Sequence, residues 1–239
     1  PAADVAADSI GVDQLTSAAT QRVFFGHMSV GNNILSGVQQ VYRQDNVEGP
    51  RVIRIAASDS TPDLSSGGAI VHSLIGANGD PKGKLVNFDA AVRGGLGEKV
   101  DVALVKFCYL DVTKGTDVDE LFRTYKATFD ALERDMPDVV FLHTTVPLTV
   151  PPSGIKAHLK ALLQGVDNPT RERYNALVRA AYPADRLLDV AAIEGTSPEG
   201  TREPSLYPGY SSDGSHLNGA GSSLVAVRFL QLLADHKVA

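Results

Sequence analysis

The octapeptide VDVALVKF at residues 100–107 is the strongest indication of the fold. Its apolar residues follow one another almost without interruption, which is typical of a strand that is buried on both faces. Strands of this kind occur almost only in parallel sheets, which helices cover on both sides. The stretch therefore predicts an α/β protein, in which further strands alternate with helices along the rest of the chain.

Such an alternation extends outward from this strand in both directions. Four more short β-rich runs are predicted as strands, at 22–26, 51–56, 139–143 and 186–190. Apolar residues at helical spacing predict helices between and after them, at 33–41, 85–92, 117–134, 168–181 and 220–233. The polar stretch 58–82 is too long for an ordinary connection and is interpreted as a functional loop or as a loop with short helical pieces.

These elements predict one domain with a three-layer α/β/α sandwich. Right-handed crossovers leave a doubly wound, mainly parallel, five-stranded and flavodoxin-like sheet as the expected topology. Residues 1–20 are interpreted as an N-terminal extension with a first helix, and residues 21–239 as the domain itself. The active site of such a sheet lies beyond the carboxyl ends of its strands.

Composition excludes several classes of protein. The 239 residues are 43% hydrophobic and 21% charged, which is ordinary for a globular domain and unlike a disordered chain. The sequence has no apolar run of about 18 residues, so no membrane span is expected. The net charge of −6 argues against a nucleic acid as partner. Oligomeric state is not predicted by any pattern in the chain.

The single cysteine, Cys108, excludes an intramolecular disulfide and is compatible with the cytoplasm or the periplasm. The chain begins at Pro1 with a short run of small and polar residues. Such a beginning is typical of a mature end left by signal-peptide removal, so a secreted or periplasmic location is favoured weakly over a cytoplasmic one.

Two short segments carry residue types that suit nucleophilic catalysis. Gly26-His27-Met28-Ser29 follows the first predicted strand, so Ser29 would lie near a helix N-terminus, where negative charge is favoured. Asp213-Gly214-Ser215-His216 precedes the last predicted helix. Asp and His three positions apart can lie on one side of a turn, with the carboxylate orienting the ring towards a serine. Ser29, His216 and Asp213 are therefore the candidate nucleophile, base and orienting residue.

Each of these residues also has an ordinary interpretation. Ser29 is a favoured residue for capping a helix, and Asp213-Gly214-Ser215 is a common turn composition. His216 is compatible with a solvated surface histidine. A metal site is the rival use for histidine, but the chain has no His-Glu-x-x-His motif and no cysteine pair. No metal and no cofactor are therefore predicted.

The two segments together resemble the SGNH (GDSL-type) hydrolase superfamily, in a divergent branch. That resemblance implies a nucleophilic serine after the first strand and an Asp-x-x-His block before the last helix, which here are Ser29 and Asp213 with His216. It also implies an oxyanion hole, for which the N–H groups of Ser29 and Gly79 are candidates. The side chain of Asn78, or alternatively that of Tyr109, is the candidate for the third donor in place of the family's asparagine. The chain departs from the family in having no asparagine after residues 100–107, and in having His27-Met28 before the serine.

Five further residues are candidates for contact with a substrate: His27, Asn33, His72, Tyr109 and His143. For the histidines a structural role is an equal alternative, because buried polar side chains are usually satisfied by hydrogen bonds. Lys106 ends a buried strand and is interpreted as the ion-pair partner of Asp111, with a reach into the site as the alternative.

The function expected from this resemblance and from the residues is that of a serine ester hydrolase. Its substrate would be a small acyl ester or an acylated carbohydrate, and a carbohydrate deacetylase is one form of it. Two alternative functions remain open. They are a catalytically silent glycan-binding domain, which the missing asparagine favours, and an acyltransferase that uses the same residues. The same scaffold supports all three, so the fold alone does not choose among them.

Overall fold

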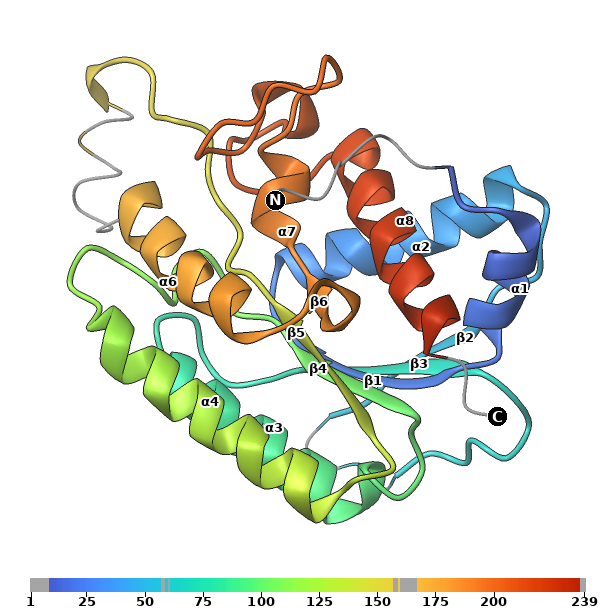
Figure 1. The fold of residues 1–239 in the computed structure, drawn as a ribbon. Coiled ribbons are helices and arrows are strands. Elements are labelled where there is room, and N and C mark those ends of the chain that lie inside the picture. Colours follow the sequence, from blue (N-terminus) through green and yellow to red (C-terminus); the bar gives the residue numbers. More distant parts are fainter. Residues whose placement is uncertain (1–8, 57–58, 60, 157–158, 160–166, 237–239) are drawn as a thin grey trace.

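The structure is a computed structural model that describes residues 9–56, 59, 61–156, 159 and 167–236 (Figure 1). Six strands form its sheet, namely β1 (Arg22–His27), β2 (Arg51–Arg54), β3 (Ala69–Leu74), β4 (Val102–Val105), β5 (Val140–Thr144) and β6 (Leu187–Leu188). The α-helices of the described residues are α1 (Val12–Ala19), α2 (Val30–Gln44), α3 (Pro81–Ala91), α4 (Val118–Asp135), α6 (Asn168–Ala181), α7 (Val190–Glu194) and α8 (Gly219–Asp235).

Shorter helical turns complete the described chain. A π-helical turn, η1 (Val92–Leu96), continues α3. Two 3₁₀ turns are η2 (Ala184–Arg186), before β6, and η3 (Pro208–Tyr210), before the last loop. The predicted division between residues 20 and 21 stays a prediction, and residues 1–8 of the predicted extension lie outside the described residues.

All strands of the sheet are parallel, in the order β2-β3-β1-β4-β5-β6. The predicted α/β sandwich with a mainly parallel sheet is therefore confirmed, but the predicted number of five strands is wrong. The additional strand is β3, Ala69–Leu74, which lies inside the stretch 58–82 that was interpreted as a loop. It runs alongside β1 with Phe25 opposite His72, so it occupies a central place in the sheet.

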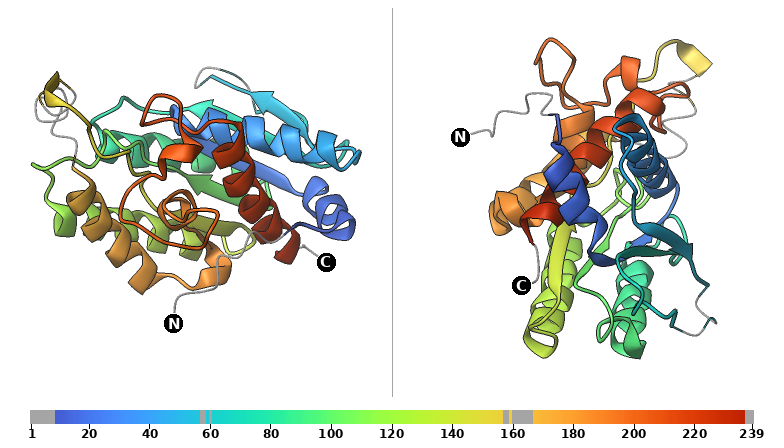
Figure 2. Two further views of the ribbon diagram at one scale, coloured as in Figure 1. Left: turned by 90° about the horizontal axis from the view of Figure 1, so that it is seen from above. Right: turned by 90° about the vertical axis from the view of Figure 1, so that its right-hand side faces the viewer.

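Helices cover both faces of this sheet (Figures 1 and 2). On one face α1, α2, α7 and α8 pack in a core that includes Phe25, Leu104 and Phe229. On the other face α3, α4 and α6 pack in a second core around Phe24, Phe129 and Phe141. The helices α2 and α8 approach so closely that a Cβ on Gly37 would meet the backbone oxygen of Ser222 at 2.2 Å. Alternate residues of each central strand thus supply both cores, as the apolar character of residues 100–107 requires.

The place of β1 in this order determines where a site can form. β1 lies between β3 and β4, and without the edge strand β2 the order is that of a flavodoxin-like sheet. The chain therefore proceeds outward from β1 on both sides, which makes the carboxyl ends of β1 and β4 the switch point at which such sheets bind ligands. Residues 28–29 and 106–111 follow these two ends. In the part of the chain that the structure describes, no helix is both long and apolar enough to span a bilayer.

Candidate active site

Ser29 occupies a strained position at the junction of β1 and α2. Its backbone has φ 45° and ψ −100°, and among the described residues only Asn46 shares a positive φ without being glycine. Conformations of this kind cost about 1–3 kcal/mol and persist where the surrounding structure imposes them. The junction is tight because a Cβ on Gly31 would lie 2.2 Å from the ring of His27. Ser29 occupies the N-cap position of α2, but its side chain forms no cap hydrogen bond.

The hydroxyl of Ser29 instead meets the imidazole of His216. Ser29 Oγ lies 2.5 Å from His216 Nε2, and His216 Nδ1 lies 2.6 Å from Asp213 Oδ2. The serine and the histidine are 187 positions apart in the sequence, and they meet where β1 ends and where the chain turns into α8. The structure thus brings together the three residues that the sequence proposed as nucleophile, base and orienting residue. Their hydrogen bonds have the geometry that a serine–histidine–aspartate triad requires, and the three residues are called the candidate triad.

A compact turn holds the aspartate and the histidine in this arrangement. Asp213 Oδ1 accepts hydrogen bonds from the backbone N–H groups of Ser215 at 2.9 Å and His216 at 2.8 Å. Ser211, which no sequence pattern indicated as a site residue, accepts from Gly214 N at 2.9 Å and donates to His216 O at 2.6 Å. Asp213-Gly214-Ser215 is therefore a turn, as the ordinary interpretation held, and it also presents the imidazole to Ser29.

The carboxylate of Asp213 is held in its charged form. Partial burial acts to raise its pKa, but hydrogen bonds from the backbone and ring of His216 and from Ser215 outweigh burial and keep the pKa well below its ordinary value. An ionised carboxylate accepts from His216 Nδ1, so Nε2 is left as the acceptor that faces Ser29. The side chains of Asp213 and His216 are 54% and 40% exposed, so the pair lies at the surface within reach of solvent.

The candidate oxyanion donors differ in whether another residue already accepts their hydrogen bond. No hydrogen bond within the described ranges uses the N–H of Ser29, which therefore remains a candidate. The N–H of Gly79 donates to Asp111 Oδ1 at 2.8 Å, so this arrangement does not support it as an oxyanion donor. Asn78 Oδ1 accepts from Lys84 Nζ at 3.2 Å, which fixes the amide and leaves its NH₂ group for a ligand.

A buried carboxylate, Asp111, joins the two loops that flank the end of β1. It accepts from Gly79 N in the loop after β3 and, at 2.6 Å, from Cys108 N in the loop after β4. Its ion-pair partner is Lys84 of α3, with Nζ to Oδ2 at 2.5 Å and both side chains fully buried. The predicted pairing of Asp111 with Lys106 is wrong, since Lys106 Nζ donates to the backbone oxygen of Phe107.

Loss of this ion pair is expected to destabilise the fold strongly. In Lys84→Met the Asp111 carboxylate stays buried without its cation, and the free energy of unfolding should fall by about 3–5 kcal/mol. Lys82→Met is the matched control on the same helix, because Lys82 pairs with Glu120 at the surface, where both side chains are 51% exposed. That exposed pair contributes about 0–1 kcal/mol. Urea denaturation of both variants checks the difference, and equal losses would contradict this account of Asp111.

Two of the candidate substrate contacts, His27 and His72, are buried beneath α2 instead. Their rings form a hydrogen bond, with His27 Nε2 3.0 Å from His72 Nδ1, and they are 0% and 8% exposed. Burial, together with the charge of Lys106, lowers the pKa of His27 to about 3, so the ring stays neutral at physiological pH. The prediction of substrate contact is therefore not supported for either residue. The alternative, that His27 packs the turn, agrees with its contact at Gly31.

His143 is likewise a core residue and not part of the site. It is 1% exposed, its Nδ1 forms a hydrogen bond of 3.0 Å with Tyr125 OH, and its ring stacks on Tyr182 with centroids 3.3 Å apart. Burial lowers its pKa, although the nearby Glu133 acts in the opposite direction. The carboxyl end of β5 was the reason to expect it at the site, but its side chain faces the helices of the second core.

Tyr109 and Asn33 remain candidates for contact with a substrate. The ring of Tyr109 packs edge to face with that of His216, with centroids 6.1 Å apart and planes at 79°. Asn33 lies one helical turn after Ser29 on α2, and its buried Oδ1 has no hydrogen-bond partner among the described residues. Tyr109 thus borders the triad, and Asn33 stays a prediction that rests on its position in α2.

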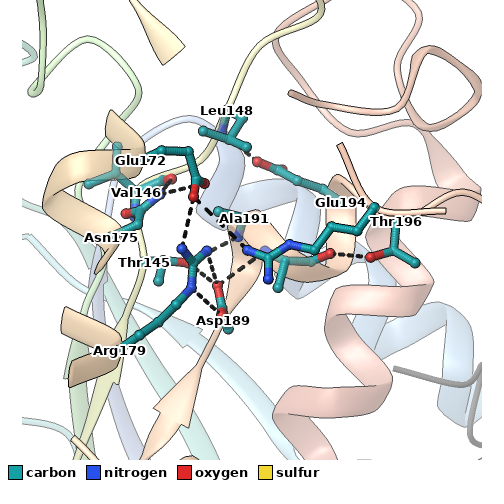
Figure 3. Close-up of polar contacts among 12 residues, drawn as sticks. Thr145, Val146, Leu148, Glu172, Asn175, Arg179, Asp189, Ala191, Glu194 and Thr196 are labelled. Atoms are coloured by element: carbon teal, nitrogen blue, oxygen red, sulfur yellow. Dashed lines mark hydrogen bonds and ion pairs between the residues drawn. The ribbon is translucent and has the colours of Figure 1, made fainter. Parts of the chain in front are cut away.

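The loop after β5 forms hydrogen bonds with residues of α6 and α7 (Figure 3). The amide of Asn175 pairs with both backbone groups of Val146, and Glu194 Oε1 accepts from Leu148 N at 2.5 Å. The Glu194 carboxyl is fully buried, and this burial raises its pKa to about 8. The N–H of Val150, two residues after Leu148, donates a hydrogen bond to Gly214 O at 2.8 Å. A rigid loop therefore holds the turn that carries Asp213.

Within the described ranges, no group of three or more His, Cys, Asp or Glu side chains could hold a metal ion. A scan against models of known protein families finds no match for the chain, and a search of curated proteins finds none either.

Solved structures do resemble the chain. A protein from Streptococcus pneumonia, described provisionally as a platelet activating factor, superposes with a TM-score of 0.57 at 16% identity, over 92% of this chain and 91% of its own. The periplasmic domain of a Salmonella ser. Paratyphi A lipopolysaccharide acetyltransferase superposes with a TM-score of 0.50 at 10% identity. This superposition covers 91% of this chain and 87% of that domain. A Desulfitobacterium hafniense protein, described provisionally as lipolytic and of the G-D-S-L family, superposes with a TM-score of 0.46 at 12% identity. This superposition covers 89% of this chain and 99% of that protein. At these identities the likeness shows the fold alone.

Proposed function

We propose that the protein is a serine ester hydrolase that removes a short acyl group from an alcohol, with Ser29, His216 and Asp213 as its triad. The observation that carries the proposal is the pair of short contacts from Ser29 Oγ to His216 Nε2 and from His216 Nδ1 to Asp213 Oδ2. The ordinary interpretation of Ser29 as a capping residue leaves its strained backbone and its missing cap bond unexplained.

In the proposed reaction Ser29 Oγ attacks the acyl carbonyl carbon while its proton passes to His216 Nε2. The negative charge of Asp213 stabilises the imidazolium that forms, and the Ser29 N–H and the Asn78 NH₂ group are the proposed donors to the oxyanion. The tetrahedral intermediate then collapses, and the leaving alcohol takes the proton from His216. Water attacks the acyl-serine in a second, equivalent round, which releases the carboxylic acid and restores the serine.

An acyltransferase is the second candidate, because the same acyl-serine can pass its acyl group to an alcohol. The exposure of Asp213 and His216 supports this second candidate, because an open site admits a bulky acceptor alcohol as well as water. One of the superposed structures is described as an acetyltransferase domain, which supports the fold but not the activity. Product analysis with a chromogenic acetyl ester and an added sugar alcohol separates the two candidates. Free acetate alone indicates the hydrolase, and an acetylated alcohol indicates the transferase.

Covalent labelling tests the proposed nucleophile. We expect a fluorophosphonate probe to form one adduct per chain, on the peptide that contains Ser29, because the general base makes this hydroxyl unusually reactive. His216→Ala is expected to lose the labelling while remaining folded, and Ser36→Ala, which removes an exposed serine from the same helix, is expected to keep it. An adduct on Cys108 or on another serine would refute the proposal.

A further inference from the structure

Arg171 is an unusual residue because its charge is completely buried. It lies in the first turns of α6 and is 0% exposed. None of the described carboxylates lies within 4.0 Å of its guanidinium, and its Nη2 has no hydrogen-bond partner there. Burial lowers its pKa to about 10, so the group keeps its charge at neutral pH. A buried cation without an ion-pair partner destabilises a fold relative to an apolar side chain of similar size.

The contacts of Arg171 reach both loops that border the triad. Its Nε donates to the backbone oxygens of Tyr109 at 2.9 Å and Val112 at 3.3 Å, in the loop after β4. Its Nη1 donates to Thr149 Oγ1 at 3.1 Å, in the loop after β5, and to Asn168 Oδ1 at 2.7 Å. Its guanidinium carbon also lies 5.5 Å from the centroid of the Tyr109 ring.

Each of these loops in turn contacts the triad turn. The ring of Tyr109 packs against the ring of His216, and Val150, which follows Thr149, holds Gly214 through its N–H. Asp213 and Ser29 bond the two nitrogens of the exposed imidazole, so Tyr109 supports the ring through aromatic packing and not through another hydrogen bond. A planar guanidinium can bond two loops in fixed directions and lie against an aromatic ring at once, whereas a lysine offers one flexible ammonium.

We propose that Arg171 is a positioning residue that orients His216 towards Ser29 through the ring of Tyr109 and through the Thr149–Val150 backbone. The expected effect on kcat rests on the proposed hydrolase function. The orientation of the His216 ring is a structural property that does not depend on that function. This positioning role explains why the charge of Arg171 is buried although its burial does not stabilise the fold. A displacement of a catalytic group by about 1 Å can lower a rate about 10²-fold, so a loosened imidazole should act mainly on kcat.

The kinetic test compares Arg171→Met, Arg171→Lys and Tyr109→Leu in the full chain, with a chromogenic acetyl ester as substrate. We expect kcat to fall by about 10- to 100-fold in all three, while KM changes less than about threefold in the two Arg171 variants. The double variant Arg171→Met/Tyr109→Leu should be little worse than either single one, because both changes remove the same support. Arg179→Met is the matched control, since Arg179 lies on the same helix but pairs with Asp189 and Glu172. It should lower the melting temperature and leave kcat within about twofold, as expected for a change that removes a structural ion pair.

A second readout separates this inference from the proposed function. The ring ¹⁵N resonances of His216 report its orientation whether or not the protein is an enzyme. They should shift in Arg171→Met and Arg171→Lys and stay unchanged in Arg179→Met. If the wild type has no turnover that depends on Ser29 but the resonances shift, the proposed function fails and the positioning stands. Unchanged resonances, or an unchanged kcat in the folded Arg171→Lys and Tyr109→Leu variants, would overturn the positioning role even if Arg171→Met did not fold.

Discussion

Ser29→Gly is expected to abolish turnover without destabilising the protein. Loss of the nucleophile should lower kcat/KM by about 10⁴- to 10⁶-fold. The backbone of Ser29, with φ 45°, is costly for a residue with a Cβ, by about 1–3 kcal/mol, and is readily accessible to glycine. Glycine loses about 0.5–1 kcal/mol through the greater entropy of its unfolded chain. The free energy of unfolding should therefore rise by about 1 kcal/mol, which denaturant titration can measure.

Two further variants make that result specific. Ser29→Ala retains the Cβ and thus the strain, so it should lose the same activity without the gain in stability. Asn46→Gly changes the other non-glycine residue that has a positive φ in the described chain, with φ 52° just after α2, and should leave turnover unaffected. A Ser29→Gly protein that is less stable than Ser29→Ala would show that the strain at the junction of β1 and α2 has been misjudged.

Asp213→Asn is expected to lower kcat by about 10⁴-fold with little loss of stability, because an amide favours the wrong tautomer of the histidine. The carboxylate accepts both the ring N–H and the backbone N–H of His216, and an asparagine side chain can replace the second bond but not the charge. The pKa of Asp213 is lowered in the folded protein, so the carboxylate is ionised from well below neutral pH upward. The stability that it contributes is present above its ordinary pKa and is lost as the pH falls below that value.

Initial rates with a chromogenic acetyl ester between pH 5 and 9 check the expected effect of Asp213→Asn. Asp119→Asn serves as the control, because Asp119 is an exposed carboxylate in the first turn of α4. It should retain the wild-type rate at each pH. A loss of less than about tenfold in Asp213→Asn would mean that Asp213 does not orient the base.

The triad could be proposed from the sequence because its position depends on the order of strands and helices more than on their boundaries. In a parallel sheet the segments after β1 and before the last helix meet at one edge, wherever the helices begin and end. The boundaries of α2 illustrate the difference, since its observed start at Val30 lies three residues before the predicted one. That shift places Ser29 at the helix cap but leaves its position at the end of β1 unchanged.

The strand β3 was missed for a physical reason. Its residues, Ala69–Leu74, include His72 and Ser73 and follow a polar stretch, so the pattern lacks the continuous apolar character of β4. Both polar side chains are nevertheless buried, His72 through its hydrogen bond to His27. Pairing with a partner from another strand is a tertiary effect that local periodicity cannot reveal.

The buried charges could not be predicted for the same reason. Arg171 and Lys84 look like the solvated positions of amphipathic helices, and only the assembled fold shows that both are fully buried. The partner of Asp111 is a lysine 27 residues away, not the nearer Lys106 that the sequence suggested. The contacts that hold the loops around the triad thus come from residues whose types are common on surfaces.

Steady-state turnover of a chromogenic acetyl ester by the wild type, Ser29→Ala and Ser36→Ala is the most direct test of the central claim. The account predicts saturable turnover by the wild type and by Ser36→Ala, and a kcat/KM for Ser29→Ala that is about 10⁴- to 10⁶-fold lower. Equal turnover by the wild type and a folded Ser29→Ala would contradict it.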